Sequence, residues 1–119
     1  MKSQTTDLIT ELARQLRELT HDHEDSTTTP VFEQVYEHPQ ASFPDKKSFA
    51  VLEINDMQFI RIALYVLIEE DAAQAEKQIY ALRDILCSDP HFEGLKGGRI
   101  MYLHLNGKFY RTLTYFYPL

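Results

Sequence analysis

The chain has 119 residues, of which 44% are hydrophobic and 12% aromatic, and 12 basic against 18 acidic side chains leave a formal net charge of −6. This length predicts one domain, over residues 1–119, that buries roughly two-thirds of its unfolded surface, and the composition argues against a disordered chain. The negative charge argues against a protein that wraps around nucleic acid by neutralising phosphates.

Signals of export, membrane insertion and thiol chemistry are weak in this sequence. The start, MKSQTTDL, lacks an apolar signal core, and no run approaches about 18 apolar residues, the length of a membrane-spanning helix. The single cysteine, Cys87, has no partner for an internal disulfide and is expected to be a small buried side chain at a helix end. We therefore expect neither secretion nor a membrane partner.

The first predicted element is an amphipathic helix over about residues 5–20. Four leucines recur at spacings of four and three and form one apolar stripe, which consists of Leu8, Leu12, Leu16 and Leu19. The polar run of residues 20–30, closed by Pro30, predicts an exposed loop.

Three strands are predicted in the middle of the chain, at about residues 31–37, 48–54 and 59–68. The last two are separated by only four residues, which predicts a hairpin. In the longest strand every second side chain is a branched aliphatic one, and we predict that this face belongs to the core: Ile60, Ile62, Leu64, Val66 and Ile68.

A second helix is predicted at about residues 72–87, with Asp71 as its cap and Gln74 three positions later. Ser88-Asp89-Pro90 ends that helix, and the glycines at 94, 97 and 98 predict a loop.

The last predicted element is a β-hairpin over residues 99–117. Asn106-Gly107 is the pair that best accepts the positive φ angles of a two-residue type I′ turn. The second strand of the hairpin carries aromatic side chains on both faces, so both faces need cover.

The order of elements predicts an α+β domain, with a mainly antiparallel sheet of about five strands and two helices packed on one face. The other face is less polar than water favours, which indicates self-association or a partner. Strand alternation alone selects the interface candidates Phe59, Arg61, Tyr65, Tyr115 and Tyr117. The alternative is that these side chains pack under loops of the same chain.

Enzymatic signatures are weak, so we expect no catalytic residues, no cofactor and no metal. No nucleotide-binding or nucleophile motif is present. The one candidate cluster of metal ligands is His21, His23 and Glu24, but it lies in a polar run and lacks the fixed spacing of a helical zinc site. A small metal-dependent enzyme that uses these residues is one alternative.

A family resemblance covers nearly the whole chain. It consists of the first helix, the strand VFEQVYE, the paired strands FAVLEIND and FIRIALYVLIEED, the helix AAQAEKQIYALRDIL, the segment DPHFEGL and the closing TLTYFYPL. This order and hydrophobic pattern resemble the tail terminator proteins of long-tailed bacteriophages, the family of the lambda-type minor tail protein U. The family has no diagnostic motif, so no residue roles are carried over.

The resemblance implies a structural virion protein of the phage tail or neck, present in the host cytoplasm during assembly. Six copies would form a ring that caps the tail tube, stops its polymerisation and joins it to a head-completion protein, with DNA passing through the lumen without specific binding. The alternative is a head-completion or neck connector protein, or another non-enzymatic interaction module.

Overall fold

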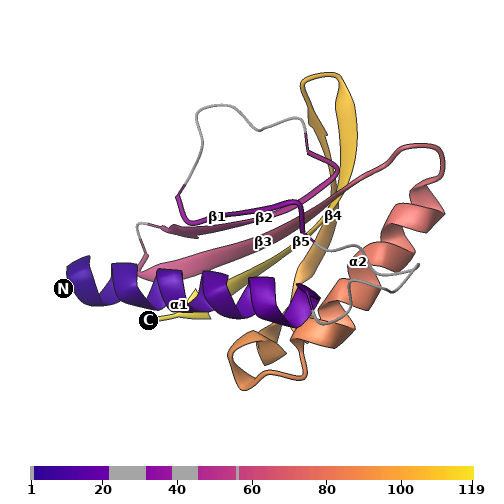
Figure 1. Cartoon of the computed structure of the whole chain (residues 1–119). Helices are drawn as coiled ribbons and strands as arrows, with labels where there is room; N and C mark the ends of the chain where they lie inside the picture. The colour runs from indigo at the N-terminus through magenta and orange to yellow at the C-terminus, as the bar shows by residue number, and fades with distance from the viewer. Residues whose placement is uncertain (1, 22–31, 39–45, 56) are drawn as a thin grey trace.

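The structure is a computed structural model that describes residues 2–21, 32–38, 46–55 and 57–119. Its elements, labelled in Figure 1, are α1 (Lys2–His21), β1 (Gln34–Tyr36), β2 (Ser48–Ile54), β3 (Phe59–Leu67), α2 (Ala72–Leu86), the 3₁₀ helix η1 (Pro90–Gly97), β4 (Arg99–Leu105) and β5 (Lys108–Pro118). The strands form one five-stranded sheet in the order β1-β2-β3-β5-β4.

The sheet is mixed, with antiparallel pairs everywhere except between β1 and β2, which run parallel. This confirms the predicted α+β class and the mainly antiparallel sheet. The parallel pair was not predicted. It is possible because the two strands are joined by a long connection, residues 37–47, rather than by a tight turn.

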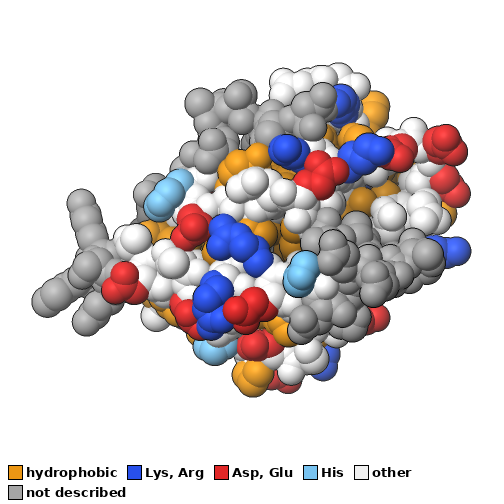
Figure 2. Space-filling view, in the orientation of Figure 1, with side chains coloured by type: hydrophobic (Ala, Val, Ile, Leu, Met, Phe, Trp, Pro, Cys, Tyr) orange, Lys and Arg blue, Asp and Glu red, His pale blue; other side chains and the backbone are white. Residues whose placement is uncertain are grey.

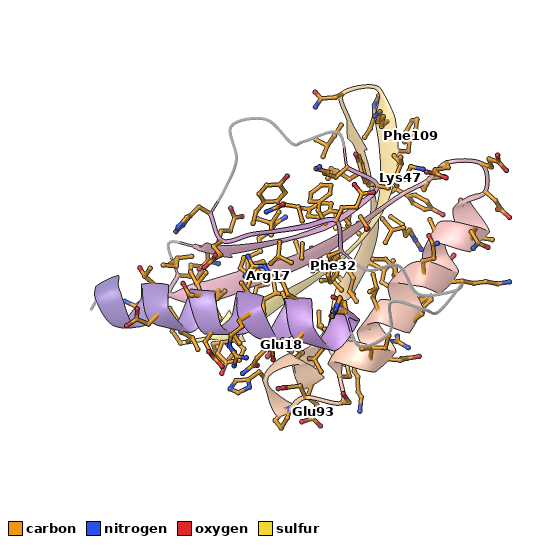
Figure 3. All side chains as sticks on the ribbon, viewed as in Figure 1. Arg17, Glu18, Phe32, Lys47, Glu93 and Phe109 are labelled. Atoms are coloured by element: carbon orange, nitrogen blue, oxygen red, sulfur yellow. The ribbon has the colours of Figure 1, made fainter. Side chains whose placement is uncertain are left out.

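The helices cover one face of the sheet, as Figure 1 shows, and the main core lies between them. α1 contacts β1 and β2, whereas α2 contacts β3 and β5. The predicted core face of β3 is confirmed, since Ile60, Ile62, Leu64 and Val66 are buried in this core. Arg17 anchors α1 to β1 by donating a hydrogen bond to the Val35 carbonyl at 3.1 Å (Figure 3).

Three segments differ from the sequence prediction. β1 covers only Gln34–Tyr36 of the predicted 31–37. α1 begins at Lys2 rather than at about residue 5, because no proline or glycine interrupts the polar residues at its start. The predicted loop around Gly94 and Gly97 is instead the 3₁₀ helix η1, which Asp89 caps and which buries Phe92 and Leu95. The three-residue spacing of these two apolar side chains matches the 3₁₀ repeat, so one side of η1 packs on the core.

Local signals at two turns are confirmed. Asn106 and Gly107 have φ angles of 51° and 79°, as a type I′ turn requires. The Asp71 carboxylate accepts a hydrogen bond from the Ala73 amide at 2.9 Å and caps α2. These turns place the β4–β5 hairpin and the β3–α2 connection, the two parts of the fold from which the candidate site is built.

Candidate interaction surface

One part of the sheet face away from the helices, called the outer face below, is closed by a second apolar cluster. Its buried members are Phe49, Val51, Ala63, Tyr65 and Tyr110. The rings of Phe49 and Tyr65 stack with centroids 4.6 Å apart, and Tyr110 meets both rings edge-on. The Tyr110 hydroxyl donates to the Lys46 carbonyl at 3.1 Å, and burial raises the pKa of this hydroxyl. This part of the outer face is therefore internal core.

Tyr65, one of the five interface candidates, belongs to this cluster and is only 1% exposed. This burial agrees with the alternative prediction, that the aromatic side chains pack within the monomer. Strand alternation placed Tyr65 on the correct face but does not reveal that β1, β2 and the β4–β5 hairpin supply apolar neighbours there. A contact between Tyr65 and another protein would require the cluster to repack.

The open part of the outer face contains a groove over β3, β5 and β4, with a volume of about 590 Å³. Its lining includes Arg61, Arg99, Met101, Leu103, Thr112 and Phe116. Met101 and Phe116 are 46% and 48% exposed, although both are large apolar side chains. We call this feature the arginine groove, because its apolar floor carries two guanidinium groups.

The sheet register decides which of the interface candidates share this groove. Arg61 pairs with Phe116 across β3 and β5, so the two side chains are on the same face. Phe59 lies beside them, with its ring 6.5 Å from that of Phe116. Tyr115 and Tyr117 are one position out of phase and pack against the core under the helices. Among the interface candidates, the groove lining contains Arg61, Tyr65 and Tyr115. Phe59 lies beside Phe116 at one end of the groove, whereas Tyr117 packs on the core and is not part of the lining.

The two arginines of the groove differ in how firmly they are held. Arg61 forms an ion pair with Glu53 at 3.0 Å and donates to the Tyr65 hydroxyl at 2.8 Å, so its guanidinium has a defined direction. Arg99 is exposed at the start of β4 and has no ion pair among the described residues. The groove therefore offers one oriented positive charge, Arg61, and one exposed positive charge, Arg99, to a partner.

Strand β4 borders the groove and is an edge strand, since it pairs with β5 alone in the described part of the sheet. Its exposed side chains include Met101 and Tyr102. Exposed edges with apolar side chains are usual places for association with another chain. Sequence reasoning missed Arg99, Met101 and Phe116 as a group, because only the register shows that they share one face with Arg61.

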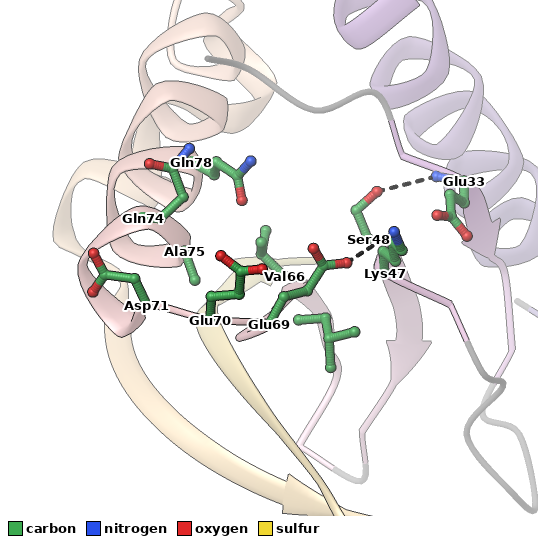
Figure 4. Close-up of a pocket in the computed structure, with 11 residues that line it drawn as sticks. Glu33, Lys47, Ser48, Val66, Glu69, Glu70, Asp71, Gln74, Ala75 and Gln78 are labelled. Atoms are coloured by element: carbon green, nitrogen blue, oxygen red, sulfur yellow. Dashed lines mark hydrogen bonds and ion pairs between the residues drawn. The ribbon is translucent and has the colours of Figure 1, made fainter. Parts of the chain in front are cut away.

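A second cavity, also of about 590 Å³, lies at the opposite end of β3, and Figure 4 shows it in close-up. Carboxylates dominate it, and Lys47 is the one basic residue in its lining. Lys47 pairs with Glu69 at 2.9 Å, and this pairing raises the pKa of the ammonium group. Asp71, at the rim of this cavity, has the helix-capping role that the sequence predicts for it.

Metal and thiol chemistry find little support in the described residues. Within them, no group of three or more His, Cys, Asp or Glu side chains is arranged to hold a metal ion. His21 ends α1, whereas His23 and Glu24 lie outside the described residues, so the alternative of a metal enzyme stays untested. Burial raises the pKa of the half-buried Cys87 thiol, which donates to the Phe92 carbonyl at 3.5 Å. This favours the neutral thiol over the reactive thiolate.

Comparison with known protein families, characterised proteins and solved structures finds no match to this chain. No helix in the described part of the chain combines the length and apolar character needed to cross a bilayer. Functional inference therefore depends on the geometry of the arginine groove, the edge strand and the acidic end of the sheet.

Proposed function

We propose that this chain is a non-enzymatic, self-associating structural protein of a bacteriophage tail or neck, and specifically a tail terminator. In this role several copies, six by family resemblance, form a ring on the end of the tail tube and stop its growth. The ring then presents a surface to a head-completion protein. The protein would be found in the virion and, during assembly, in the host cytoplasm.

The observation that carries the proposal is the arginine groove beside the edge strand β4. Two large apolar side chains, Met101 and Phe116, are about half exposed there, and β4 pairs with β5 alone within the described part of the sheet. Binding of another protein over these apolar side chains removes them from water and so lowers the free energy of the complex. Elsewhere on the outer face, apolar side chains are already buried by residues of the same chain.

Charge and element order support the more specific part of the proposal. The net charge of −6 favours a lumen along which DNA moves without being held. The order α1, three strands, α2 and a closing hairpin is the order on which the resemblance to tail terminators depends. η1, between α2 and the hairpin, corresponds to the DPHFEGL segment of that resemblance.

The direct test uses the purified chain with the tail-tube protein of the same phage. Native mass spectrometry measures its assembly state alone and on tubes, and electron microscopy measures tube length. We expect rings at tube ends and tubes that stop growing once the chain is added. A chain that stays monomeric alone and beside tubes, with tube growth unchanged, would contradict the proposal.

A pair of methionine variants tests the groove itself. Met101→Asp introduces a charge into the apolar floor and should abolish ring formation, because covering the groove would then bury an unpaired carboxylate. The matched control is Met57→Asp, at a position that is 76% exposed and outside the groove. Both variants should unfold at the urea concentration of the unchanged chain. Equal assembly by the two variants would show that the groove is not the contact surface.

A further inference from the structure

The β4–β5 hairpin is the basic part of an otherwise acidic chain. All 18 acidic residues precede Arg99 in the sequence, whereas the hairpin carries Arg99, Lys108 and Arg111. On the side of the molecule that Figure 2 shows, no acidic side chain lies at the turn end of the hairpin, which is at the top of Figure 1. An acidic partner is therefore favoured at this hairpin, although the chain as a whole has a net charge of −6.

The sheet has two edges, and they differ in how much backbone they offer to another chain. β1 has only three residues, and short edge strands are one way in which proteins prevent unwanted pairing. β4 has seven residues, contains neither proline nor glycine, and pairs with β5 alone within the described part of the sheet. β4 is therefore the edge with room for an added strand.

The sheet register shows which backbone groups of β4 face this edge. The Phe109 carbonyl accepts a hydrogen bond from the amide of Ile68, which follows β3, at 2.8 Å. A residue of an antiparallel strand directs its N–H and C=O to the same side, so Phe109 and its neighbour His104 form a non-hydrogen-bonded pair. His104 and, two positions before it, Tyr102 therefore direct their backbone N–H and C=O away from β5, towards the open edge.

We propose that β4 binds an extended, acidic segment of a different protein, which joins the sheet as a further strand antiparallel to β4. The backbone groups of Tyr102 and His104 pair with the segment, as in other cases of strand addition. Antiparallel pairing, the more stable kind, places the C-terminal end of the segment beside Arg99, the first residue of β4. Arg99 is exposed and has no ion pair among the described residues, so a carboxylate at that end of the segment gains a partner.

Alternation along the added strand defines its other side chains. Those on the outer face lie beside Met101 and Leu103, at the border of the arginine groove, so apolar residues are favoured there. Those on the helix face lie beside Tyr102 and His104, which are both exposed. The segment is therefore expected to have an apolar residue at every second position and its acidic residues near the C-terminal end.

A second copy of this chain is a poorer occupant of the edge. Pairing β4 with the β4 of another copy would bring two basic hairpins together, and like charges at close range oppose binding. The added strand also differs in direction from a contact on the arginine groove. It lies in the plane of the sheet, about 4.8 Å from β4, whereas a protein that covers the groove lies above the sheet. Strand addition at β4 therefore goes beyond the self-association proposed above and does not depend on it.

Two synthetic peptides test the charge of the occupant, with the whole purified chain as receptor. The probe is a fluorescent, amidated seven-residue peptide, the length of β4, in which valine and threonine alternate before two final glutamates. Its matched control ends in two lysines instead. Fluorescence anisotropy at 0.15 M salt should show the acidic peptide binding about tenfold more tightly than the basic one. The net charge of the chain would favour the opposite order.

A charge reversal at Arg99 tests where the carboxylates bind. Arg99→Glu should abolish the preference for the acidic peptide, because the glutamates of the peptide then meet a like charge. The matched control is Lys77→Glu, which changes the net charge equally at an exposed position on α2. It should keep the preference of the unchanged chain.

A pair of variants at Tyr102 separates strand addition from contact through side chains. Tyr102→Pro removes the N–H that faces the edge and no N–H that faces β5, and proline is tolerated at such positions of edge strands. Tyr102→Ala removes the same side chain and keeps the N–H. The proline variant should bind the acidic peptide at least about tenfold more weakly, and the alanine variant within about threefold of the unchanged chain. Circular dichroism should show that both variants are folded.

Amide hydrogen exchange, followed by NMR in the unchanged chain, gives a measurement that needs no variant. Without peptide, the amides of Tyr102 and His104 should exchange faster than those of Met101 and Leu103, which face β5. An excess of the acidic peptide should slow exchange at Tyr102 and His104. If a higher concentration of the chain alone slows exchange at these two amides, a second copy occupies the edge and the proposal is wrong.

Several results would overturn strand addition. They are equal binding of the two peptides, equal loss of preference in the Arg99 and Lys77 variants, equal binding by the two Tyr102 variants when both are folded, and unchanged exchange at Tyr102 and His104 with excess peptide. Each of these leaves the proposed tail role standing, because the peptide experiments contain no tubes. A chain that binds the acidic peptide along β4 but neither forms rings nor stops tube growth would contradict the tail role alone.

Discussion

Replacing Tyr65 with alanine should destabilise the folded monomer, because this residue is a central member of the outer-face cluster. Its side chain is 1% exposed, stacks on Phe49 at 4.6 Å and meets Tyr110 edge-on at 6.4 Å. Truncation of a buried aromatic side chain costs about 3–5 kcal/mol, which includes the lost transfer free energy and the cavity left behind. We expect a loss of about 4 kcal/mol in the free energy of unfolding.

A loss of this size is a large part of the 5–15 kcal/mol that is typical of a folded domain. At a slope of about 2 kcal/mol per molar urea, the unfolding midpoint should fall by roughly 2 M. Tyr65→Phe keeps the ring and removes only the hydroxyl that accepts a hydrogen bond from Arg61 at 2.8 Å. Its cost should be about 1 kcal/mol.

Urea unfolding followed by circular dichroism measures these differences, and tyrosine fluorescence provides a second probe because the chain has no tryptophan. The control is Tyr102→Ala, at an aromatic position that is 56% exposed and contacts Arg111 through its ring. It should cost at most about 1 kcal/mol. If Tyr65→Ala kept the urea midpoint of the unchanged chain and lost self-association, Tyr65 would be an interface residue and our assignment to the core would be wrong.

Two further predictions concern η1 and the cysteine. Gly94→Ala should lower the free energy of unfolding by about 1–3 kcal/mol, because the added Cβ would lie 2.1 Å from the Tyr115 ring. Gly97→Ala is the control, since no atom lies within 4 Å of its added Cβ. It should change the free energy of unfolding by at most about 0.5 kcal/mol. Equal urea midpoints for the two variants would contradict the close packing of η1 on β5. Iodoacetamide should alkylate Cys87 more slowly at pH 8 in the folded chain than in urea, because burial raises the thiol pKa and lowers the thiolate fraction. The alkylation rate of the folded chain should increase at higher pH. Faster reaction in the folded chain would refute this.

Features that depend on a few neighbouring residues were predictable from the sequence. The Asn106-Gly107 turn has the positive φ angles that the pair favours, and Asp71 caps α2 through its own side chain. The aliphatic face of β3 was also predictable, because alternation alone places every second side chain on one side of a strand. The α+β class follows from the order of such elements.

The composition of the interaction surface required the tertiary structure. Alternation indicates that Phe59, Arg61 and Tyr65 share a face of β3, but it does not indicate what covers each part of that face. The register between β3 and β5 places Phe116, and not Tyr115, beside Arg61, and a shift of one residue would exchange them. η1 was likewise not predicted as a helix, since its glycines suggested a loop and only the packing of Phe92 and Leu95 on the core shows its one apolar side.

By itself the sequence determined the positions of turns and helix caps and the two faces of each strand, because these features depend on a few neighbouring residues. Only the tertiary structure decided that Tyr65 is buried, that Arg61, Arg99 and Met101 form one groove, and that Glu70 lines a cavity at the opposite end of the sheet. These outcomes depend on strand register and on contacts between segments far apart in the chain, which no local pattern of residues specifies.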